Sequence, residues 1–420
     1  MMENRDWKET DFGRIPFNWE YLTLDDIKSD VKRSLISGPF GSNISAKFFK
    51  PSGIPVIRGN NLSLDLSIKF KDDGFVFIDE NKANELNTWA KKGDVIFTAV
   101  GTIGQVGYLD GNERFEKYII SNKQIRLSVN ENLILPLYSY YWFASDLLKD
   151  MIIQRNTGSS VPLINLTVLK SLPVIVPPLP EQKAIASVLS GLDDKIDLLH
   201  QQNQTLETLA ETLFRQWFIE EVKEDWEDCT IEDLCIKINS GGTPSTKIDS
   251  YYNGDINWYS TKELNDNYLF SSNSKITQEG LDNSSAKIFP AGTVVIAIYA
   301  APTVGRLGIL TEDSAFNQAA CGLVANDKIC SKEFLYLYLK NQRVELNLMA
   351  SGSAQQNLNV GKIKSYPCFV PDSIIMEKFK FQVEPLFSKI LDNSKQIQTL
   401  TQLRDTLLPK LMSGEVRVKN

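Results

Sequence analysis

The chain has 420 residues, of which 42% are hydrophobic and 23% are charged, and its formal net charge is −7. These values are ordinary for globular proteins, so they exclude a wholly disordered chain, and the length suits two or three domains. No apolar run approaches the roughly 18 residues that a membrane-spanning helix needs. The N-terminal sequence lacks the basic and then apolar pattern of an export signal, so we expect a cytoplasmic protein without membrane contact.

The cysteines and the single histidine exclude several kinds of chemistry. No two cysteines form a C-x-x-C pair, and their odd number argues against a disulfide framework, so we expect reduced and mostly buried thiols. His200 is the only histidine and lies in a heptad-patterned stretch, where we expect it on a helix surface. Zinc sites and histidine-dependent hydrolases are disfavoured, and we predict neither catalytic residues nor metal ligands. The cysteines are Cys229, Cys235, Cys321, Cys330 and Cys368.

The charge is unevenly distributed along the chain. Residues 181–233 hold 14 acids and 4 bases, a balance of −10. Residues 30–130 hold 14 bases and 11 acids, and residues 235–371 hold 12 bases and 11 acids, so both regions are slightly basic. The acidic total therefore does not exclude DNA contact by these two regions. It does predict weak nonspecific DNA affinity for the isolated chain, because neutralised phosphates supply that affinity.

Two regions of the chain carry the signals of mixed α and β structure. Apolar and β-branched runs at 54–58, 94–98 and 294–298 predict strands, and residues 101–104 and 302–305 predict turns. Residues 137–151 and 331–349 predict helices with aromatic side chains at core-like spacing.

The strongest feature is an internal repeat. Residues 158–218 align with residues 352–412 without a gap at a constant offset of 194, and 18 of these 61 positions are identical. The likeness extends upstream, where Trp19 and the residues after it resemble Trp226 and its successors. Repetition over so long a period predicts a tandem duplication of a globular unit followed by a long helix.

The two helical segments carry apolar residues at alternating spacings of three and four, which is typical of a coiled coil. Asn203, Asn393 and Arg404 are polar members of this seam and are expected to fix its register. Pro385 predicts a kink or a helix start, and Gly414 predicts a helix end. The predicted apolar seam residues are Leu189, Leu192, Ile196, Leu199, Leu206, Leu213, Leu386, Ile390, Ile397, Leu400 and Leu407.

Two arrangements of these helices stay open from the periodicity. They pair within one chain, where the repeat makes them antiparallel, or they hold two chains together as a rod. The acidic pair Asp193 and Asp194 is expected on a solvated helix face. The predicted organisation is a first globular domain at 1–175, a helix at 176–220, a second domain at 221–371, a helix at 372–412 and a tail at 413–420.

The sequence contains no nucleotide-binding loop, no dinucleotide fingerprint and no amino-methyltransferase tetrapeptide. The repeated units offer instead glycine-containing turns with hydrogen-bonding side chains, of the types that contact phosphates and base edges. Such runs are usually ordinary loops, but their recurrence in both units favours a shared role. The candidate DNA-binding residues are Ser42, Asn43, Lys47, Arg58, Asn60, Asn61, Gln105, Ser159, Ser160, Thr243, Ser245, Lys247, Ser260, Lys262, Arg306, Ser353, Gln355 and Gln356.

The whole pattern resembles the DNA specificity subunit of type I restriction-modification systems, in the right order and twice over. The segments that carry the resemblance are Ile15-Pro16 with Trp19, residues 93–96 with 101–104, residues 172–182, and residues 407–415. The second unit departs from the pattern, because Pro371-Asp372 stands where the first has Pro177-Pro178, and the Glu-Gln pair that follows in the first is missing. This departure weakens any specific role for Glu181 and Gln182.

The resemblance implies two target recognition domains of mixed α+β fold, each reading one half of a split site in double-stranded DNA, and two antiparallel helices that set the gap. It implies no catalytic activity and no cofactor in this chain. The expected partners are two methyltransferase subunits that bind S-adenosylmethionine and, in a restricting complex, two ATP-dependent translocase/nuclease subunits. The alternatives are a pseudo-symmetric coiled-coil adaptor for a ligand other than nucleic acid, and an unrecognised enzyme.

Overall fold

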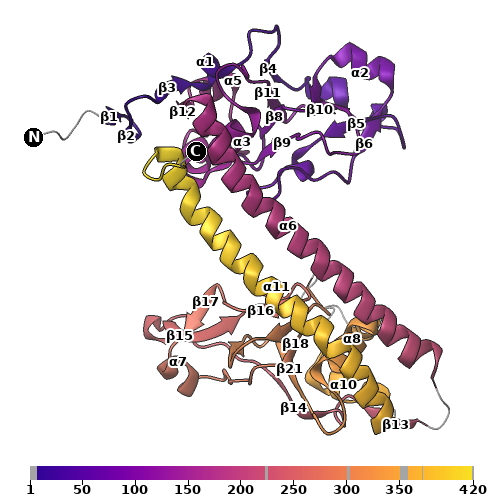
Figure 1. Cartoon of the computed structure of the whole chain (residues 1–420). Coiled ribbons are helices and arrows are strands. Elements are labelled where there is room, and N and C mark those ends of the chain that lie inside the picture. Colours follow the sequence, from indigo (N-terminus) through magenta and orange to yellow (C-terminus); the bar gives the residue numbers. More distant parts are fainter. Residues whose placement is uncertain (1–6, 223–225, 300–302, 351–357, 371, 419–420) are drawn as a thin grey trace, which may run out of the picture. The chain divides into compact units, whose positions relative to one another are not determined.

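The computed structural model describes residues 7–222, 226–299, 303–350, 358–370 and 372–418, and it divides into two compact units (Figure 1). The first unit comprises Met1–Leu198 and Gln398–Asn420, and the second comprises Leu199–Ile397. Each unit therefore holds one globular domain and one half of each of two long helices. These helices are α6 (Leu179–Arg215, followed by a π turn at Gln216–Glu220) and α11 (Ser373–Ser413).

The first domain is built on two four-stranded sheets. One is antiparallel, in the order β4-β11-β8-β9, and the other has the order β6-β5-β10-β7 with β5 and β10 parallel. All four side chains of β8 are buried, as its apolar sequence predicts. The first sheet contains β4 (Leu35–Ser37), β11 (Gln124–Leu127), β8 (Val95–Thr98) and β9 (Val106–Tyr108), and the second contains β6 (Val76–Ile78), β5 (Ile54–Ile57), β10 (Lys117–Ile120) and β7 (Trp89–Lys91).

Short strand pairs and helices complete this domain. The strand pairs are β1 (Trp7–Thr10) with β2 (Gly13–Pro16) and β3 (Glu20–Thr23) with β12 (Pro173–Val176). The helices are α1 (Leu24–Ile27), α2 (Glu80–Leu86), α3 (Pro136–Ala144), α4 (Asp146–Gln154) and α5 (Leu166–Lys170). The helical stretch predicted at 137–151 is confirmed but is divided into two helices at Ser145, whose hydroxyl accepts a hydrogen bond from Leu148 and begins α4.

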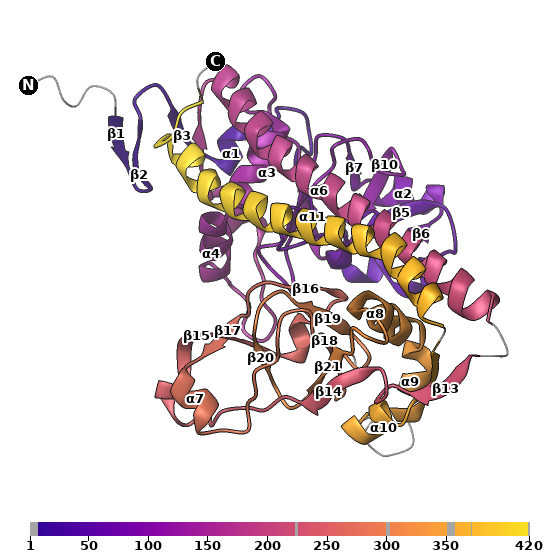
Figure 2. The ribbon, with the colours of Figure 1, turned by 60° about the horizontal axis from the view of Figure 1, so that its bottom comes forward.

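The second domain repeats this plan (Figure 2). A five-stranded sheet has the order β14-β21-β18-β19-β16, and a three-stranded sheet has the order β17-β15-β20 with β15 and β20 parallel. The helical stretch predicted at 331–349 is also divided into two helices, α8 and α9. The elements are β13 (Glu227–Thr230), β14 (Cys235–Ser240), β15 (Tyr252–Tyr259), β16 (Asn267–Leu269), β17 (Ser274–Ile276), α7 (Gln278–Asp282), β18 (Val294–Ala297), β19 (Leu307–Leu310), β20 (Ala315–Phe316), β21 (Ala320–Ala325), α8 (Lys332–Asn341), α9 (Arg343–Ala350), α10 (Val360–Lys364) and β22 (Pro367–Val370).

Equivalent hydrogen bonds confirm the internal duplication. In the first unit, the Trp142 indole on α3 donates to the carbonyl of Pro173 at 2.8 Å. In the second unit, the Tyr338 hydroxyl on α8 donates to the carbonyl of Pro367 at 2.7 Å. The two prolines are separated by the repeat offset of 194. In both units a buried aromatic helix is thus anchored to the strand that precedes a long helix.

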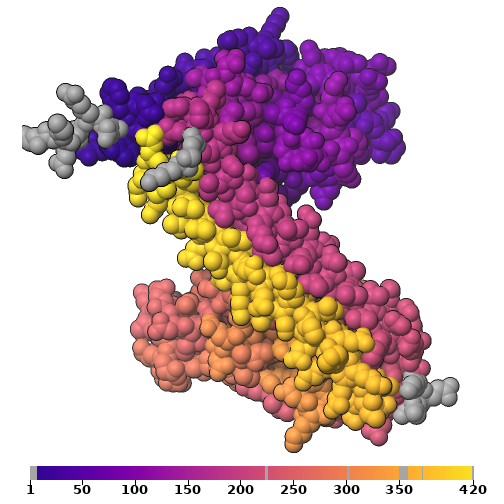
Figure 3. All heavy atoms as spheres, in the orientation of Figure 1, coloured from indigo at the N-terminus to yellow at the C-terminus, as the bar shows by residue number. Residues whose placement is uncertain are grey.

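Within each unit the two long helices run antiparallel. In the first unit, Asp193 of α6 bonds Arg404 of α11, and Glu181 at the start of α6 bonds Arg417, just beyond the end of α11. In the second unit, the amide of Asn393 donates to Asn203 at 2.9 Å, and the α6 residue Phe214 packs on Phe379 of α11. Positions rise along α6 as their partners fall along α11, which confirms the pairing within one chain. The space-filling view shows the side chains of the two helices in direct contact (Figure 3).

The eleven predicted seam leucines and isoleucines are all buried or half-buried. Near the end of α6, Phe214 and, in the π turn that follows, Phe218 are buried because both pack on Phe334 of α8 and on Phe379 of α11. The prediction of a helix start at Pro385 is wrong, because α11 begins at Ser373. The predicted end at Gly414 is confirmed: α11 ends one residue earlier, and Gly414 has a φ of +78°.

A buried ion pair joins the two helices in the first unit, and it corrects the expectation of a solvated Asp193. Asp193 is fully buried, and its Oδ1 accepts a hydrogen bond from the Arg404 guanidinium at 2.9 Å. Its other oxygen accepts from the Tyr141 hydroxyl at 2.5 Å. Burial lowers the pKa of Arg404, but its hydrogen bonds to Asp193 and Asp405 outweigh that effect and raise the pKa overall. Asp194 is exposed, as expected.

Both domains begin with the same aspartate brace, which predicts a shared acid sensitivity. Asp26 accepts hydrogen bonds from the backbone and hydroxyl of Thr23, and Asp233 accepts both from Thr230. The side-chain bond from Thr23 lowers the pKa of Asp26, and the backbone bond from Thr230 lowers that of Asp233. Because the folded pKa is lowered, this stabilisation is present above the ordinary value of 3.8 and is lost as the pH falls through the folded value.

We therefore expect the D26N/D233N variant to melt below the wild type at neutral pH. The difference between their melting temperatures should shrink as the pH falls below about 4, because protonation removes the brace from the wild type as well. Thermal unfolding followed by circular dichroism at a series of pH values measures this difference. A gap that stays constant down to the lowest pH would contradict the assignment.

Candidate nucleic-acid interface

In both units a glycine turn lies against the backbone of a hairpin-like turn. The amide of Gly38 donates to the carbonyl of Gln124 at 2.8 Å, and a Cβ at Gly38 would lie 1.8 Å from the carbonyl oxygen of Ser121. The amide of Gly241 donates to Ala320 at 3.1 Å, and a Cβ there would lie 2.0 Å from the carbonyl oxygen of Phe316. Only glycine permits this approach, so the same backbone arrangement positions two sets of exposed side chains.

Alanine at either glycine should therefore disturb its turn. We expect G38A and G241A each to cost about 1–3 kcal/mol of unfolding free energy, because a backbone oxygen occupies the place of the new methyl group. G191A is the matched control, since a Cβ at this helical position meets nothing within 4 Å. Urea unfolding of the three variants measures the costs. Equal stability of G38A and G191A would show that the turn accommodates the added methyl group without cost, which would contradict the prediction.

A pocket of about 540 Å³ in the first unit brings together three predicted DNA-binding residues, Arg58, Asn60 and Gln105. The turn that follows β10 forms another wall of the pocket. Gln124, which also lines the pocket, is only 1% exposed, and its amide nitrogen has no hydrogen-bond partner among the described residues. The pocket is lined by Ile44, Phe49, Val56, Arg58, Gly59, Asn60, Thr98, Val100, Gly101, Thr102, Gln105, Ser121, Asn122, Lys123 and Gln124.

Local hydrogen bonds separate the side chains that reach solvent from those that brace the loop. Arg58 and Asn60 both donate to the carbonyl of Gly74 and remain partly or fully exposed. Asn61 is completely buried, and its amide donates to Lys71 and Asp73, so its predicted contact with DNA does not fit this structure. Gln105 is half-buried and accepts a hydrogen bond from Thr98 at 2.9 Å.

The remaining predicted residues of the first unit lie on exposed loops. Ser42 and Asn43 belong to a 3₁₀ turn, Gly41–Ile44, that follows the Gly38 turn, and Lys47 belongs to the next turn. Ser159 and Ser160 are exposed in a segment that joins the sheet where the amide of Gly101 donates to Pro162 at 2.9 Å.

The second unit places its predicted residues in two groups. Thr243 hydrogen-bonds Gln318, and Ser245 and Lys247 are exposed on the same loop. Ser260 caps the 3₁₀ turn Thr261–Glu263, where its hydroxyl donates a hydrogen bond to the Glu263 carboxylate. This hydroxyl therefore stabilises the turn.

The second group comprises Ser260, Lys262 and Arg306, and Asn265 links Lys262 to Arg306. Its amide donates to the carbonyl of Lys262, and its oxygen accepts from Arg306 at 2.9 Å. Ser353, Gln355 and Gln356 lie outside the described residues.

Sequence reasoning missed the turns behind the two glycines. Asn122 and Lys123 are exposed in the first unit, and Gln318 is exposed in the second. It also missed Phe40, which is 84% exposed between the two glycines of its loop. These turns contain neither glycine nor proline, the residues that usually indicate a turn in a sequence. Their polar residues do lie between two apolar strand-like runs, and that contrast is the signal by which they could have been predicted.

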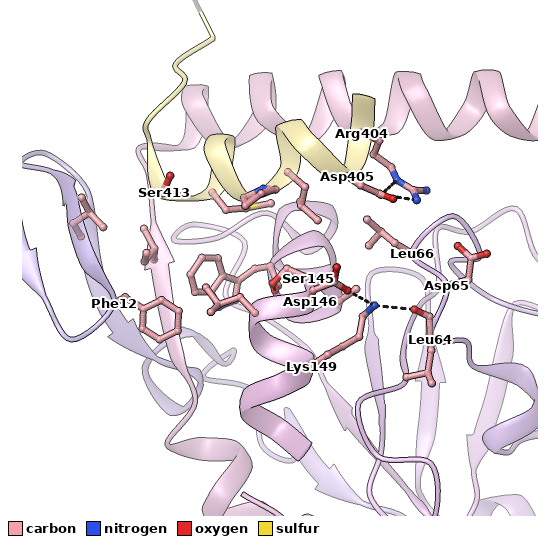
Figure 4. Close-up of a pocket in the computed structure, with 18 of the residues that line it drawn as sticks. Phe12, Leu64, Asp65, Leu66, Ser145, Asp146, Lys149, Arg404, Asp405 and Ser413 are labelled. Atoms are coloured by element: carbon pink, nitrogen blue, oxygen red, sulfur yellow. Dashed lines mark hydrogen bonds and ion pairs between the residues drawn. The ribbon is translucent and has the colours of Figure 1, made fainter. Parts of the chain in front are cut away.

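A second pocket, of about 280 Å³, lies beside the end of α11 and contains none of the predicted DNA-binding residues (Figure 4). Phe12, Leu66 and Leu408 contribute to its apolar lining. At its rim Lys149 bonds Asp146 at 2.8 Å and the carbonyl of Leu64 at 2.9 Å. Within the described ranges, no helix is long and apolar enough to cross a membrane, and no cluster of three or more His, Cys, Asp or Glu side chains is placed to hold a metal ion.

Comparisons with known proteins agree on one family. Residues 18–208 and 223–397 match the type I restriction modification DNA specificity domain. The type I restriction enzyme MjaIX specificity subunit of Methanocaldococcus jannaschii is 25% identical, covering 99% of this chain and 97% of that protein. The HindI specificity subunit of Haemophilus influenzae is 25% identical, covering 78% of this chain and 87% of that protein. A solved S subunit from M. genitalium shares the fold with a TM-score of 0.58, 17% identity, and coverage of 94% of this chain and 96% of that one.

Proposed function

Because the chain belongs to the type I restriction modification DNA specificity family and carries two specificity domains in tandem, we propose that it reads a bipartite, asymmetric DNA site. Each globular domain contacts one half of the site, and the paired helices α6 and α11 set the gap between the halves. The family match favours this function over the adaptor hypothesis.

The observation that carries the proposal is the duplicated turn. Gly38 and Gly241 hold the same backbone arrangement, while the side chains of the two turns differ: Asn122 and Lys123 in the first unit stand where the second has Gln318 and Ala319. Lysine contacts phosphates or guanine, whereas glutamine pairs with the N6 and N7 edge of adenine. A common scaffold with different side chains suits two half-sites of different sequence.

The partners follow from the same proposal. Two methyltransferase subunits dock on the helices and supply S-adenosylmethionine chemistry, and two ATP-dependent translocase/nuclease subunits join a restricting complex. The chain itself performs no catalysis and works in the cytoplasm. The acidic stretch at 181–233 and the apolar pocket beside α11 are the surfaces that support docking, since an exposed apolar hollow with a charged rim is typical of interaction sites.

The test uses the chain co-purified with its methyltransferase subunit. DNA fragments bound from a random pool are sequenced, and we expect one enriched motif with two different halves and a fixed gap. Enrichment of a single continuous motif, or binding without sequence preference at physiological salt, would contradict the proposal.

A further inference from the structure

Two cysteines of the second domain lie directly opposite one another where the chain enters and leaves that domain. Strands β13 and β22 form a two-stranded antiparallel sheet, and Cys229 faces Cys368 in its register. Their Sγ atoms are 2.9 Å apart, although the residues are 139 positions apart in sequence. Cys368 is buried, and Cys229 is half-buried and so reachable from solvent.

The strand register alone brings the two residues within bridging range. Residues opposite each other in antiparallel strands have Cα atoms about 4.5–5.5 Å apart, and disulfides form at Cα separations of about 4.4–6.8 Å. The backbone therefore has no need to move for a bond to form. Cys235 and Cys321 belong to neighbouring strands, but Cys235 faces Ala325 and Cys321 faces Ser240, so neither has a cysteine opposite it.

The internal repeat supplies a comparison within the same chain. In the first unit the equivalent strands β3 and β12 place Leu22 opposite Val174, and Val174 is separated from Cys368 by the repeat offset of 194. The first unit thus has two aliphatic side chains where the second has two thiols. A single cysteine would serve as a small apolar residue at either position. Two thiols in one cross-strand pair point instead to a bond between them.

We propose that Cys229 and Cys368 are a reversible modification site, which closes to a cross-strand disulfide on reaction with a small disulfide such as oxidised glutathione. The Cys229 thiolate attacks one sulfur of oxidised glutathione, forms a mixed disulfide and releases one glutathione thiolate. The deprotonated Cys368 then attacks the Cys229 sulfur and releases the second glutathione. Two protein thiols are oxidised, one glutathione disulfide is reduced, and the two protons lost by the cysteines are taken up by the glutathione thiolates.

The surroundings make this reaction slow and its product stabilising. Burial raises the pKa of Cys229 and, separately, that of Cys368, so few thiolates are present at neutral pH. Once formed, the bond ties the first strand of the second domain to its last, closing a long loop and restricting the unfolded chain. Oxidation therefore stabilises the second domain. It leaves the stability of the first domain unchanged, because that domain has Leu22 and Val174 at the equivalent positions.

The test incubates the purified full-length chain in glutathione buffers of increasing oxidation at mildly alkaline pH, followed by alkylation and peptide mapping. We expect the number of free thiols to fall from five to three, with one cross-linked peptide pair that contains Cys229 and Cys368. A reducing agent should restore all five. The melting temperature of the second unit should rise on oxidation by on the order of 5–10 °C.

The C229L/C368V variant is the matched control, because it carries the residues that the first unit has at this pair. It should fold, keep its three thiols in every buffer and melt at the same temperature in reduced and oxidised glutathione. The proposal is overturned if five free thiols persist in a buffer that oxidises the urea-unfolded chain. It is equally overturned by a glutathione adduct on Cys229 without the cross-link, or by a cross-link to a different cysteine.

Discussion

Replacing Arg404 by alanine is expected to lower the unfolding free energy of the first unit by about 3–5 kcal/mol, because it leaves a carboxylate buried without its counter-ion. Asp193 is fully buried and Arg404 is 3% exposed, so the pair is shielded from bulk solvent. The hydrogen bond from Tyr141 remains but carries no charge. Urea unfolding followed by hydrogen exchange in α6 and α11 measures the loss in the first unit.

The second unit provides the matched control for this experiment. At the positions equivalent to Asp193 and Arg404 it has Phe387 and Ala210, both buried. The D193F/R404A double variant should therefore regain most of the stability that R404A loses, since an apolar pair often replaces a buried ion pair without cost. The Tyr141 hydroxyl then lacks its acceptor, and adding Y141L removes that unpaired group. A single R404A variant as stable as the wild type would show that the ion pair contributes nothing.

Changes in the two equivalent turns are expected to have different effects on DNA binding. K123A removes a positive charge from an exposed position, so affinity should fall for every sequence and the slope of log affinity against log salt should decrease by about 1. Q318A removes no charge. It should cost about 1–3 kcal/mol against the preferred base and relax one position in the second half-site, while the salt slope stays unchanged. Fluorescence anisotropy of the complex at several salt concentrations separates the two outcomes.

K117A serves as a control for K123A, because Lys117 is also exposed but lies at the far end of β10 from the turn. Equal losses for K117A and K123A would indicate general charge attraction instead of a contact at this turn. A change in the first half-site caused by Q318A would contradict the assignment of one domain to each half.

The periodic parts of the molecule could be predicted from the sequence, and the parts that depend on contacts between distant segments could not. The seam residues from Leu189 to Leu407 follow a fixed spacing, so their pattern is enough to identify the paired helices. Asp193 looked like a surface residue because its partners, Tyr141 and Arg404, come from segments that only folding brings together. Ser145 interrupts an apolar helical pattern, and hydrophobic periodicity does not register a helix cap.

The candidate site shows the same division. Glycine-rich loops such as 38–43 were visible, whereas the polar turn at 121–124 had no glycine or proline to mark it. Asn61 has the right chemistry for DNA but is buried by the loop that it braces. Glu181 and Gln182 lack a counterpart in the second unit, yet Gln182 is fully buried and bonds the backbone of Leu133, Leu135 and Pro177, so it holds the start of α6 in the first unit. Glu181 accepts a hydrogen bond from the Trp19 indole and pairs with Arg417.

The most direct test of the central claim is methylome sequencing of cells that express this chain with its methyltransferase subunit, before and after exchange of residues 235–371 for the second domain of a relative. We expect a split, asymmetric methylated motif in which the exchange alters one half and leaves the other half and the gap unchanged. A stable co-purified complex that produces no modified motif, or an exchange that alters both halves together, would contradict it.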